Sequence, residues 1–378
     1  MILSAQHEMI RDTVRKFARE ELAPHSARWD RESRFPREAL KGLAQMGLYG
    51  VAIAEEWGGA GMDSTALALA IEEIAAGDGA TSTIVQVNNL VAGILSGYGS
   101  AAQKETYLRP LARGGLLGAF ALTEPHTGSD AAAITTRAER SGGEYVLNGT
   151  KQFITSGKNA DIAIVFAVSD RTAGKKGLSA FVVPTSNPGY KVGRIEEKAG
   201  QHASDTAQVL LEDCRVPADH LLGEEGLGYR IALANLESGR INVAAQSVGM
   251  ASAAFAAALA YAGERRSFGK TLIEHQAVNF RLADMATGIE AARQLYLHAA
   301  ALRDAGRRCL KEASMAKLFA SETAEKVCSD AIQIHGGYGY VTDFPVERIW
   351  RDVRVTQIYE GASDIQRLVI GRALGEGA

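Results

Sequence analysis

The spacing of apolar residues changes twice along the 378-residue chain, and this constrains the fold more than any other feature. Helical spacing fills the first 115 residues and returns from about residue 226, while short apolar runs typical of strands fill the segment between them. Helices and strands that are grouped rather than alternating indicate an α+β protein and not a series of βαβ units. The predicted domains are 1–115 (helical), 116–225 (β) and 226–378 (helical).

Three helical segments are predicted in the first domain. The first places these apolar side chains on one face: Ile10, Val14, Phe17 and Ala18. The second covers 66–76, with Glu72 and Glu73 on its polar side, and the third covers 82–95. In the last domain, one apolar stripe is formed by Met315, Leu318, Phe319, Val327, Ala331 and Ile334.

Strands are predicted from the apolar runs at 116–122, 161–168, 178–184 and 208–216. Asn148 and Gly149 stand between two further runs, 144–147 and 150–155. Asn-Gly is a strong hairpin signal, because both residues of such a turn must accept a positive φ. A hairpin that turns at these two residues is therefore predicted.

Composition excludes several classes of protein. The net charge is −3, so no basic excess points to nucleic acid or to an anionic membrane surface. No CxxC pair or Cys/His cluster occurs, so neither a disulfide framework nor a metal site is expected, and a reducing cytoplasm is the expected location. The N-terminus has no signal-peptide pattern. Residues 241–263 are rich in alanine but include Asn242 and Gln246, which favours a buried bundle helix over a membrane span.

Four segments have residue types suited to chemistry or ligand binding. Residues 123–130 form a polar loop, which is either an ordinary turn or a ligand contact. Residues 265–270 are basic and are either a solvated face or a pyrophosphate contact, since arginine binds phosphate in a bidentate manner. Residues 335–340 are glycine-rich and form either a helix end or a backbone that approaches a phosphate or another subunit. Glu360 either caps a helix that starts near Ser363 or is a desolvated base.

A nicotinamide cofactor is not supported by the sequence. No GxxxxGK[ST] motif occurs, and the glycine-containing stretch 223–228 includes two acids and lacks the strand-to-helix order of a dinucleotide-binding unit.

These segments, in this order, resemble the signatures of the acyl-CoA dehydrogenase family, and the resemblance covers nearly the whole chain. The matching stretches are Leu122–Asp130, Arg265–Lys270, Glu274–Gln276, Gln333–Tyr340 and Gln357–Arg367. The resemblance implies an N-terminal helical domain, a central β-barrel-like domain and a C-terminal four-helix bundle, with FAD as cofactor.

The resemblance also implies roles for individual residues. The flavin would contact Phe120, Leu122, Thr123, Ser129, Phe153, Ile154 and Thr155. The adenine dinucleotide part would be bound by Arg265, Ser267, Phe268 and Gln276. The FAD of a neighbouring subunit would be reached by Gln333, Gly336 and Gly337. Residues near the cofactor would also include Ala362, Ser363 and Asp364. The acyl-CoA would contact Ser129, Glu237, Arg240 and Gly361.

Glu360 is the implied catalytic base, which removes the α-proton while its own backbone N–H stabilises the developing enolate. Some relatives carry the base on an earlier helix, but Gly239 stands at that position here. Phe153 replaces a frequent Trp, and Ala362 replaces a frequent Thr.

The implied reaction is α,β-dehydrogenation of a short, straight or branched acyl-CoA. Electron-transferring flavoprotein is the implied acceptor, and a homo-oligomer such as a dimer of dimers is the implied assembly. An acyl-CoA oxidase, a flavin monooxygenase on the same fold and a scaffold without cofactor are the alternatives.

Overall fold

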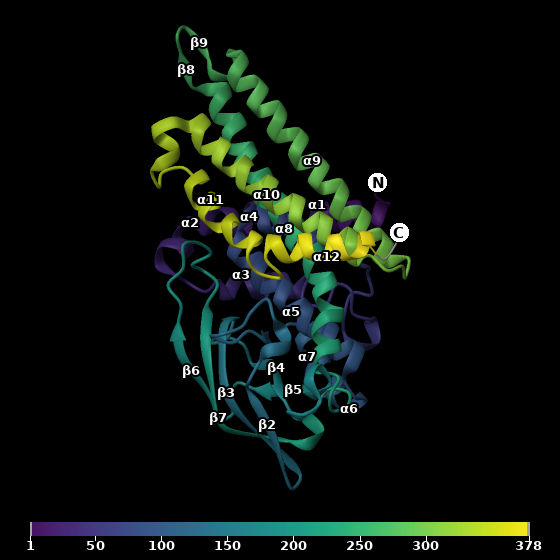
Figure 1. Cartoon of the computed structure of the whole chain (residues 1–378). Coiled ribbons are helices and arrows are strands. Elements are labelled where there is room, and N and C mark those ends of the chain that lie inside the picture. Colours follow the sequence, from purple (N-terminus) through teal and green to yellow (C-terminus); the bar gives the residue numbers. More distant parts are fainter. Residues whose placement is uncertain (1, 376–378) are drawn as a thin grey trace.

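The computed structural model describes residues 2–375 and is elongated (Figure 1). A curled sheet lies at one end, long C-terminal helices extend to the other end, and the N-terminal helices pack where the two meet. The N-terminal helices are α1 Ala5–Phe17, α2 Ala23–Glu32, α3 Arg37–Gln45, α4 Ser64–Gly77, α5 Gly79–Tyr98, α6 Ala101–Gln103 and α7 Arg109–Ala112. The predicted helical segments at 66–76 and 82–95 are confirmed, since they lie inside α4 and α5.

Helix α4 begins where Asp63 accepts a hydrogen bond from the Ala66 N–H. Its two acids do not form a solvated polar side, so that prediction is wrong: Glu72 and Glu73 are both buried. Glu72 accepts hydrogen bonds from Arg293, and Glu73 forms an ion pair with Arg15. Buried carboxylates of this kind are tolerated because each has a cationic partner. Those partners are remote in sequence, so helical spacing could not reveal them.

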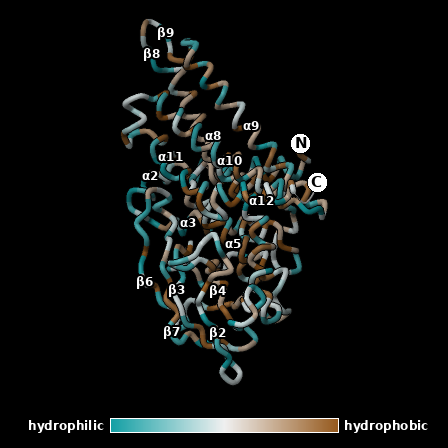
Figure 2. The backbone as a smooth tube through the Cα atoms, in the orientation of Figure 1, coloured by the Kyte–Doolittle hydropathy of each residue, from teal (hydrophilic) through white to brown (hydrophobic). Residues whose placement is uncertain are grey.

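The central sheet has seven strands: β1 Gly118–Ala121, β2 Arg137–Ser141, β3 Glu144–Thr155, β4 Ile162–Val168, β5 Leu178–Pro184, β6 Tyr190–Ile195 and β7 Thr206–Pro217. The pairing order is β1-β4-β2-β3-β7-β6, and β5 pairs with β4. Strand β4 is buried on both faces, whereas the edge strand β6 is mostly exposed, and Figure 2 shows the matching contrast in hydropathy. The strands predicted at 116–122, 161–168, 178–184 and 208–216 are confirmed.

The predicted hairpin at Asn148 and Gly149 is wrong, because both residues lie inside the continuous strand β3. The chain turns earlier, at Gly142, where φ is +64°, and β2 pairs with β3 from there. The pairing of β3 with β7 shifts register between Leu147 and Gly149, so Asn148 lies opposite a bulge in β7 that contains Asp213, where φ is +46°. Its side-chain amide exchanges hydrogen bonds with Asp213 across the two strands. Tertiary pairing thus keeps the Asn-Gly pair inside β3, opposite a bulge in β7, and not in a turn.

The C-terminal helices are α8 Gly228–Glu264, α9 Gln276–Asp304, α10 Leu310–His335, α11 Val346–Val353 and α12 Ser363–Gly375. A small hairpin of β8 Arg266–Ser267 and β9 Lys270–Thr271 joins α8 to α9. Among the described residues, α8 alone is long and apolar enough to cross a membrane, but 61% of its apolar window is buried within the protein, as in the core helix of a bundle. The prediction of a buried bundle helix at 241–263 is therefore confirmed.

The predicted apolar stripe on α10 holds only in the second half of the helix, where Val327, Ala331 and Ile334 are buried. In the first half, Phe319 is 41% exposed. The buried positions there include three polar side chains: Ser314, Lys317 and Ser321. Of these, Lys317 donates to the carbonyl of Gly361, in the segment that precedes α12 and contains Glu360.

Candidate active site

Glu360 lies in a short turn between the 3-10 helix η9 Arg354–Gln357 and α12. Both Glu360 (φ +53°) and Gly361 (φ +91°) adopt the left-handed conformation. A non-glycine residue with this backbone geometry is strained and needs support from its surroundings. Gln366 Nε2 donates to the carbonyls of Glu360 (3.2 Å) and Gly361 (2.8 Å), and Lys317 Nζ donates to the Gly361 carbonyl (2.8 Å).

The Glu360 carboxylate is desolvated. The residue as a whole is only partly buried, but its Oε2 atom is buried and has no hydrogen-bond partner within residues 2–375. Burial raises the pKa of Glu360 to about 7, and the positive charges of Arg240 and Lys317 oppose that rise. A carboxyl group that titrates near neutral pH and accepts no hydrogen bond is suited to accept a proton. The interpretation of Glu360 as a helix cap therefore has no support in this geometry.

Gly239 on α8 leaves the space that the carboxylate occupies. A Cβ atom at this position would lie 2.4 Å from Glu360 Oε2. The two residues line a small pocket together with Gln86, Val87, Leu90 and Asn242. Its volume is about 10 Å³, close to the space of one water molecule.

Gly239→Ala is therefore expected to displace the Glu360 carboxylate and to lower turnover by about 100-fold, because a shift of about 1 Å at a reacting group can have that effect. The variant should keep its thermal unfolding midpoint within a few degrees, since alanine favours the helix. Steady-state kinetics with a short acyl-CoA test this expectation, with Gly263→Ala, at an open position of the same helix, as the control. Equal rates in both variants would contradict it.

Arg240 and Glu237 lie one turn apart on α8. Arg240 is buried and donates to Ser314 Oγ, while its Nε atom has no partner among the described residues. Glu237 accepts hydrogen bonds from Arg303 and from the Cys309 thiol. The structure thus brings Gly239, Arg240 and the Glu360–Gly361 turn together at one site.

Phe153 and its neighbours form a second part of the predicted site, on the sheet. The β3–β7 register shifts between Lys151 and Ile154, so Phe153 lies in a bulge with φ +59°. Its neighbours in the strand are buried, but Phe153 itself is 62% exposed. The Gln152 N–H donates to the Thr123 carbonyl (2.8 Å), which joins this bulge to the 123–130 loop. A rigidly held, exposed aromatic ring on a strained backbone is suited to contact a planar ligand.

A buried ion pair supports that bulge. Lys151 is fully buried and its Nζ donates to Glu124 Oε1 (2.8 Å) and to the Leu122 carbonyl (3.1 Å). Glu124 also accepts hydrogen bonds from the N–H groups of Thr135 and Thr136. Despite burial, these donors and the Lys151 charge lower the pKa of Glu124 to about 2. The sequence does not reveal this pair, because Glu124 lies in the loop after β1 whereas Lys151 lies in β3.

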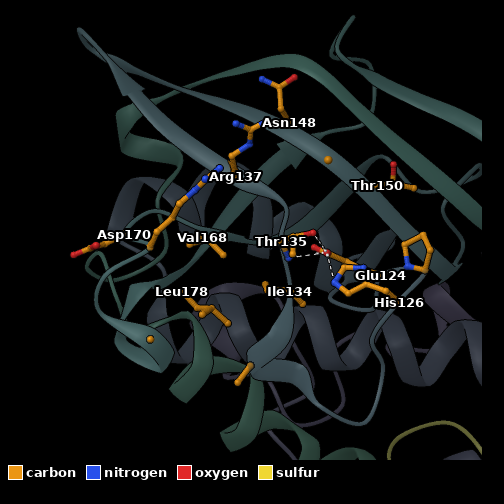
Figure 3. Close-up of a pocket in the computed structure, with 15 residues that line it drawn as sticks. Glu124, His126, Ile134, Thr135, Arg137, Asn148, Thr150, Val168, Asp170 and Leu178 are labelled. Atoms are coloured by element: carbon orange, nitrogen blue, oxygen red, sulfur yellow. Dashed lines mark hydrogen bonds and ion pairs between the residues drawn. The ribbon is translucent and has the colours of Figure 1, made fainter.

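A cleft of about 930 Å³ lies on the β domain and is lined by Glu124, His126, Arg137, Asp170 and eleven further residues (Figure 3). Figure 3 shows Arg137 and Asp170 on one side and Glu124, His126 and Thr135 on the other. Glu124 is the buried acid of this cleft, but its low pKa makes it a poor base. The volume of a pocket is therefore not enough to identify the site of the reaction, and Glu360 is the better candidate for proton transfer.

A third group of predicted residues lies at the far end of the C-terminal helices, away from the sheet (Figure 1). It includes Phe268, which is 97% exposed with φ +49°, in the β8–β9 turn. Arg265 lies over the ring of Tyr338, which places the 336–340 segment at this same end. Gly336 ends α10 with φ +61° and ψ −135°, which agrees with a helix end but differs from the usual left-handed cap. No other group of residues 2–375 lies within 4 Å of a Cβ placed at Gly336 or Gly337.

Within one chain, the structure therefore separates most of the predicted cofactor residues into two sets, while Ala362, Ser363 and Asp364 lie beside the Glu360 turn. The set at the sheet comprises Phe120, Leu122, Thr123, Ser129, Phe153, Ile154 and Thr155. The set at the far end comprises Arg265, Ser267, Phe268, Gln276, Gln333, Gly336 and Gly337. The two sets can complete one site only if they come from different subunits. The family resemblance implies contact with the FAD of a neighbouring subunit only for Gln333, Gly336 and Gly337.

Three consecutive stretches of the chain match one protein family. Residues 4–115 match the acyl-CoA dehydrogenase N-terminal domain, 119–214 the middle domain and 226–375 the C-terminal domain. The chain belongs to the acyl-CoA dehydrogenase family. It is therefore an oxidoreductase, and the family is FAD-dependent.

Several acyl-CoA dehydrogenases resemble this chain closely. It is 46% identical to the mitochondrial short-chain specific acyl-CoA dehydrogenase of Rattus norvegicus, over 97% of this chain and 90% of that protein. The butyryl-CoA dehydrogenase of Megasphaera elsdenii has a TM-score of 0.97, 40% identity and 99% coverage of both chains. A chain solved in work on the electron transferring flavoprotein of Acidaminococcus fermentans has a TM-score of 0.98, 44% identity and 99% coverage of both chains.

The geometry of this acyl-CoA dehydrogenase fits FAD. The exposed Phe153 ring offers an aromatic face, and the Thr123 loop beside it offers backbone and hydroxyl groups. The buried Ser363 Oγ, next to the Glu360 turn, has no partner within residues 2–375 and is a free donor for a ligand. Within one chain, the predicted residues at the far end of the C-terminal helices lie away from these groups (Figure 1).

Proposed function

We propose that this acyl-CoA dehydrogenase converts a short, straight or branched acyl-CoA to its trans-2-enoyl-CoA, with Glu360 as the base that removes the α-proton. The observation that carries the proposal is the buried, unpartnered Oε2 atom of Glu360, held beside Gly239 in a pocket. FAD, held beside Phe153 and the Thr123 loop, would supply the acceptor for the β-hydrogen as hydride. The residues of the chain must meet every other requirement of the reaction.

The chain must make an α-proton acidic enough for a carboxylate to remove. Desolvation supports this, because it raises the pKa of Glu360 to about 7 and so strengthens the carboxylate as a base. Negative charge then develops on the thioester oxygen, and a preorganised donor must meet it. The Glu360 N–H is available for this role, since it makes no backbone hydrogen bond to the described residues. Glu360 would thus supply both the base, through its carboxylate, and the hydrogen-bond donor, through its backbone N–H.

A short acyl group is supported by the names of two relatives, the short-chain specific acyl-CoA dehydrogenase of Rattus norvegicus and the butyryl-CoA dehydrogenase of Megasphaera elsdenii. Binding pockets discriminate each extra methylene by only about 1–3 kcal/mol, so related short substrates are expected to compete.

We propose electron-transferring flavoprotein as the electron acceptor and a homo-oligomer, a dimer of dimers, as the working assembly in the cytoplasm. The assembly is supported by Phe268, which is exposed, and by Gly336 and Gly337, which have open space around them within residues 2–375. A second subunit with its cofactor would cover these residues. An oxidase would instead pass electrons to O₂. The peroxide yield in air separates these two reactions.

The test is an anaerobic titration of the purified protein with butyryl-, isobutyryl-, 2-methylbutyryl- and octanoyl-CoA, followed by the visible absorbance of the flavin. We expect one of the three short substrates to bleach the flavin band at a lower concentration than octanoyl-CoA. A bound flavin that none of them bleaches would overturn the proposed reaction and favour monooxygenase chemistry. Purification without any flavin would favour a scaffold.

A further inference from the structure

Lys317 is an unusual residue to find in the interior of a helical bundle. It lies on α10 with no exposed surface, among the largest fully buried side chains of the protein. Burying an ammonium group without a partner is costly, so most buried lysines are paired with a carboxylate at hydrogen-bond distance. Lys317 forms no such ion pair among the described residues. Its Nζ donates instead to the Gly361 carbonyl at 2.8 Å.

This hydrogen bond acts on the most strained part of the candidate active site. Glu360 and Gly361 are consecutive left-handed residues, and glycine is the natural occupant of only the second position. Gln366 supports the same turn from α12 through its amide, which contacts both carbonyls. Lys317 supports it from α10, on the side of the bundle core. With their carbonyls held in this way, the two residues keep the Glu360 N–H free.

The charges around Lys317 come from three elements. Glu360 approaches from the turn, Arg240 from α8 and Glu322 from its own helix. Burial lowers the pKa of Lys317 to about 8, with Arg240 acting in the same direction and the two acids opposing it. Around the Glu360 carboxylate, the cations are Arg240 and Lys317. Lys317 is therefore linked to Glu360 both by position, through the turn, and by charge.

We propose that Lys317 is a positioning residue that fixes the Glu360–Gly361 turn and thereby sets the direction of the Glu360 carboxylate and N–H. The proposal rests on the proposed role of Glu360 as the base. A purely structural role would be met equally well by an apolar side chain of similar length, which would avoid the desolvation of the ammonium group.

The test is Lys317→Met, which keeps the length of the side chain but removes the donor and the charge. The rate constant of flavin reduction by butyryl-CoA is measured anaerobically from pH 6 to pH 9 in the FAD-loaded enzyme, beside thermal unfolding and flavin content. We expect a fall of about 10- to 100-fold at pH 7, since misplacement of a reacting group has effects of this size. The rise of the rate with pH should also move to higher pH, because a cation that lowers the pKa of Glu360 is lost.

Lys326→Met is the matched control, because Lys326 lies on the same helix with its side chain 71% exposed. It should match the wild-type rate and pH profile. A folded Lys317→Met enzyme with the wild-type rate and pH profile would overturn the proposal. If Lys317→Met does not fold, Lys317→Gln takes its place. Its shorter side chain carries no charge and leaves its amide short of the Gly361 carbonyl that Lys317 Nζ contacts, so a folded Lys317→Gln enzyme with the wild-type rate and pH profile would overturn the proposal equally.

The role of Glu360 itself is tested separately by Glu360→Gln. If that variant turns over normally, the proposed function fails, whatever Lys317 does. If it is inactive while Lys317→Met behaves like the wild type, only the positioning role of Lys317 fails.

Discussion

Glu360→Gln is expected to keep FAD bound and to lower turnover by about 10²–10⁴-fold, the usual contribution of a positioned general base. The glutamine side chain has nearly the same shape, so the contacts of the turn with Gln366 and Lys317 should persist. An amide cannot accept the α-proton. Anaerobic flavin reduction by butyryl-CoA is the measurement, because it reports proton removal and hydride transfer without any electron acceptor.

The same variant is also expected to be more stable than the wild type at neutral pH. The folded-state pKa of Glu360 is about 7 and its ordinary value is 4.5. Between these values the unfolded chain loses the proton while the folded protein retains it, so wild-type stability falls as pH rises. The resulting decrease in the free energy of unfolding reaches about 3 kcal/mol above pH 7 and is absent below pH 4.5. Glutamine removes this penalty.

Thermal unfolding of both proteins between pH 5 and pH 8 measures that difference. The stability advantage of Glu360→Gln should grow as pH rises, and Glu290→Gln, at an exposed position on α9, should show no such trend. An inactive variant with no pH-dependent gain in stability would mean that the Glu360 carboxylate is solvated in the folded protein. Full activity in Glu360→Gln would remove Glu360 from the mechanism altogether.

Much of the fold could be predicted from the period of the apolar residues. Helices α4 and α5 and strands β4, β5 and β7 were found in this way, because each buries a whole face or both faces. The hairpin at Asn148 and Gly149 failed because a local turn preference was overridden by pairing with β7. Local propensity is a weak guide wherever a long strand can gain further pairing.

Less of the candidate site could be predicted from the residues alone. Local features of Glu360 allowed a helix cap as readily as a base, and the deciding contact is with Gly239, on another helix. Lys317 and Lys151 resemble ordinary surface lysines in the sequence, yet both are fully buried. No pattern in a single sequence marks a buried charge, because its partner or acceptor is brought to it by the fold. The family resemblance supplied the role of Glu360, but not the role of these lysines.

Lys151→Met is expected to lower the free energy of unfolding by about 3–5 kcal/mol, because it leaves the buried Glu124 carboxylate without its cation. The loss should also reach the cofactor. Lys151 fixes the Leu122 carbonyl, and the adjoining bulge holds Phe153 and Thr123 together. We therefore expect a lower flavin content or faster flavin dissociation, measured by absorbance after gel filtration, together with a lower thermal midpoint.

Two comparisons decide whether the buried ion pair is the cause. Lys191→Met removes a lysine from an ion pair with Glu212 on the same sheet, but both partners are more than half exposed, so its effect should lie within about 1 kcal/mol. The double variant Glu124→Gln, Lys151→Met removes both charges, while the single amide oxygen can still accept from one of the Thr135 and Thr136 N–H groups, which contact different oxygens of Glu124. It should recover part of the lost stability and flavin. If instead the double variant is as unstable as the sum of the two single variants, the Glu124 charge does not cause the loss, and packing of the Lys151 side chain does.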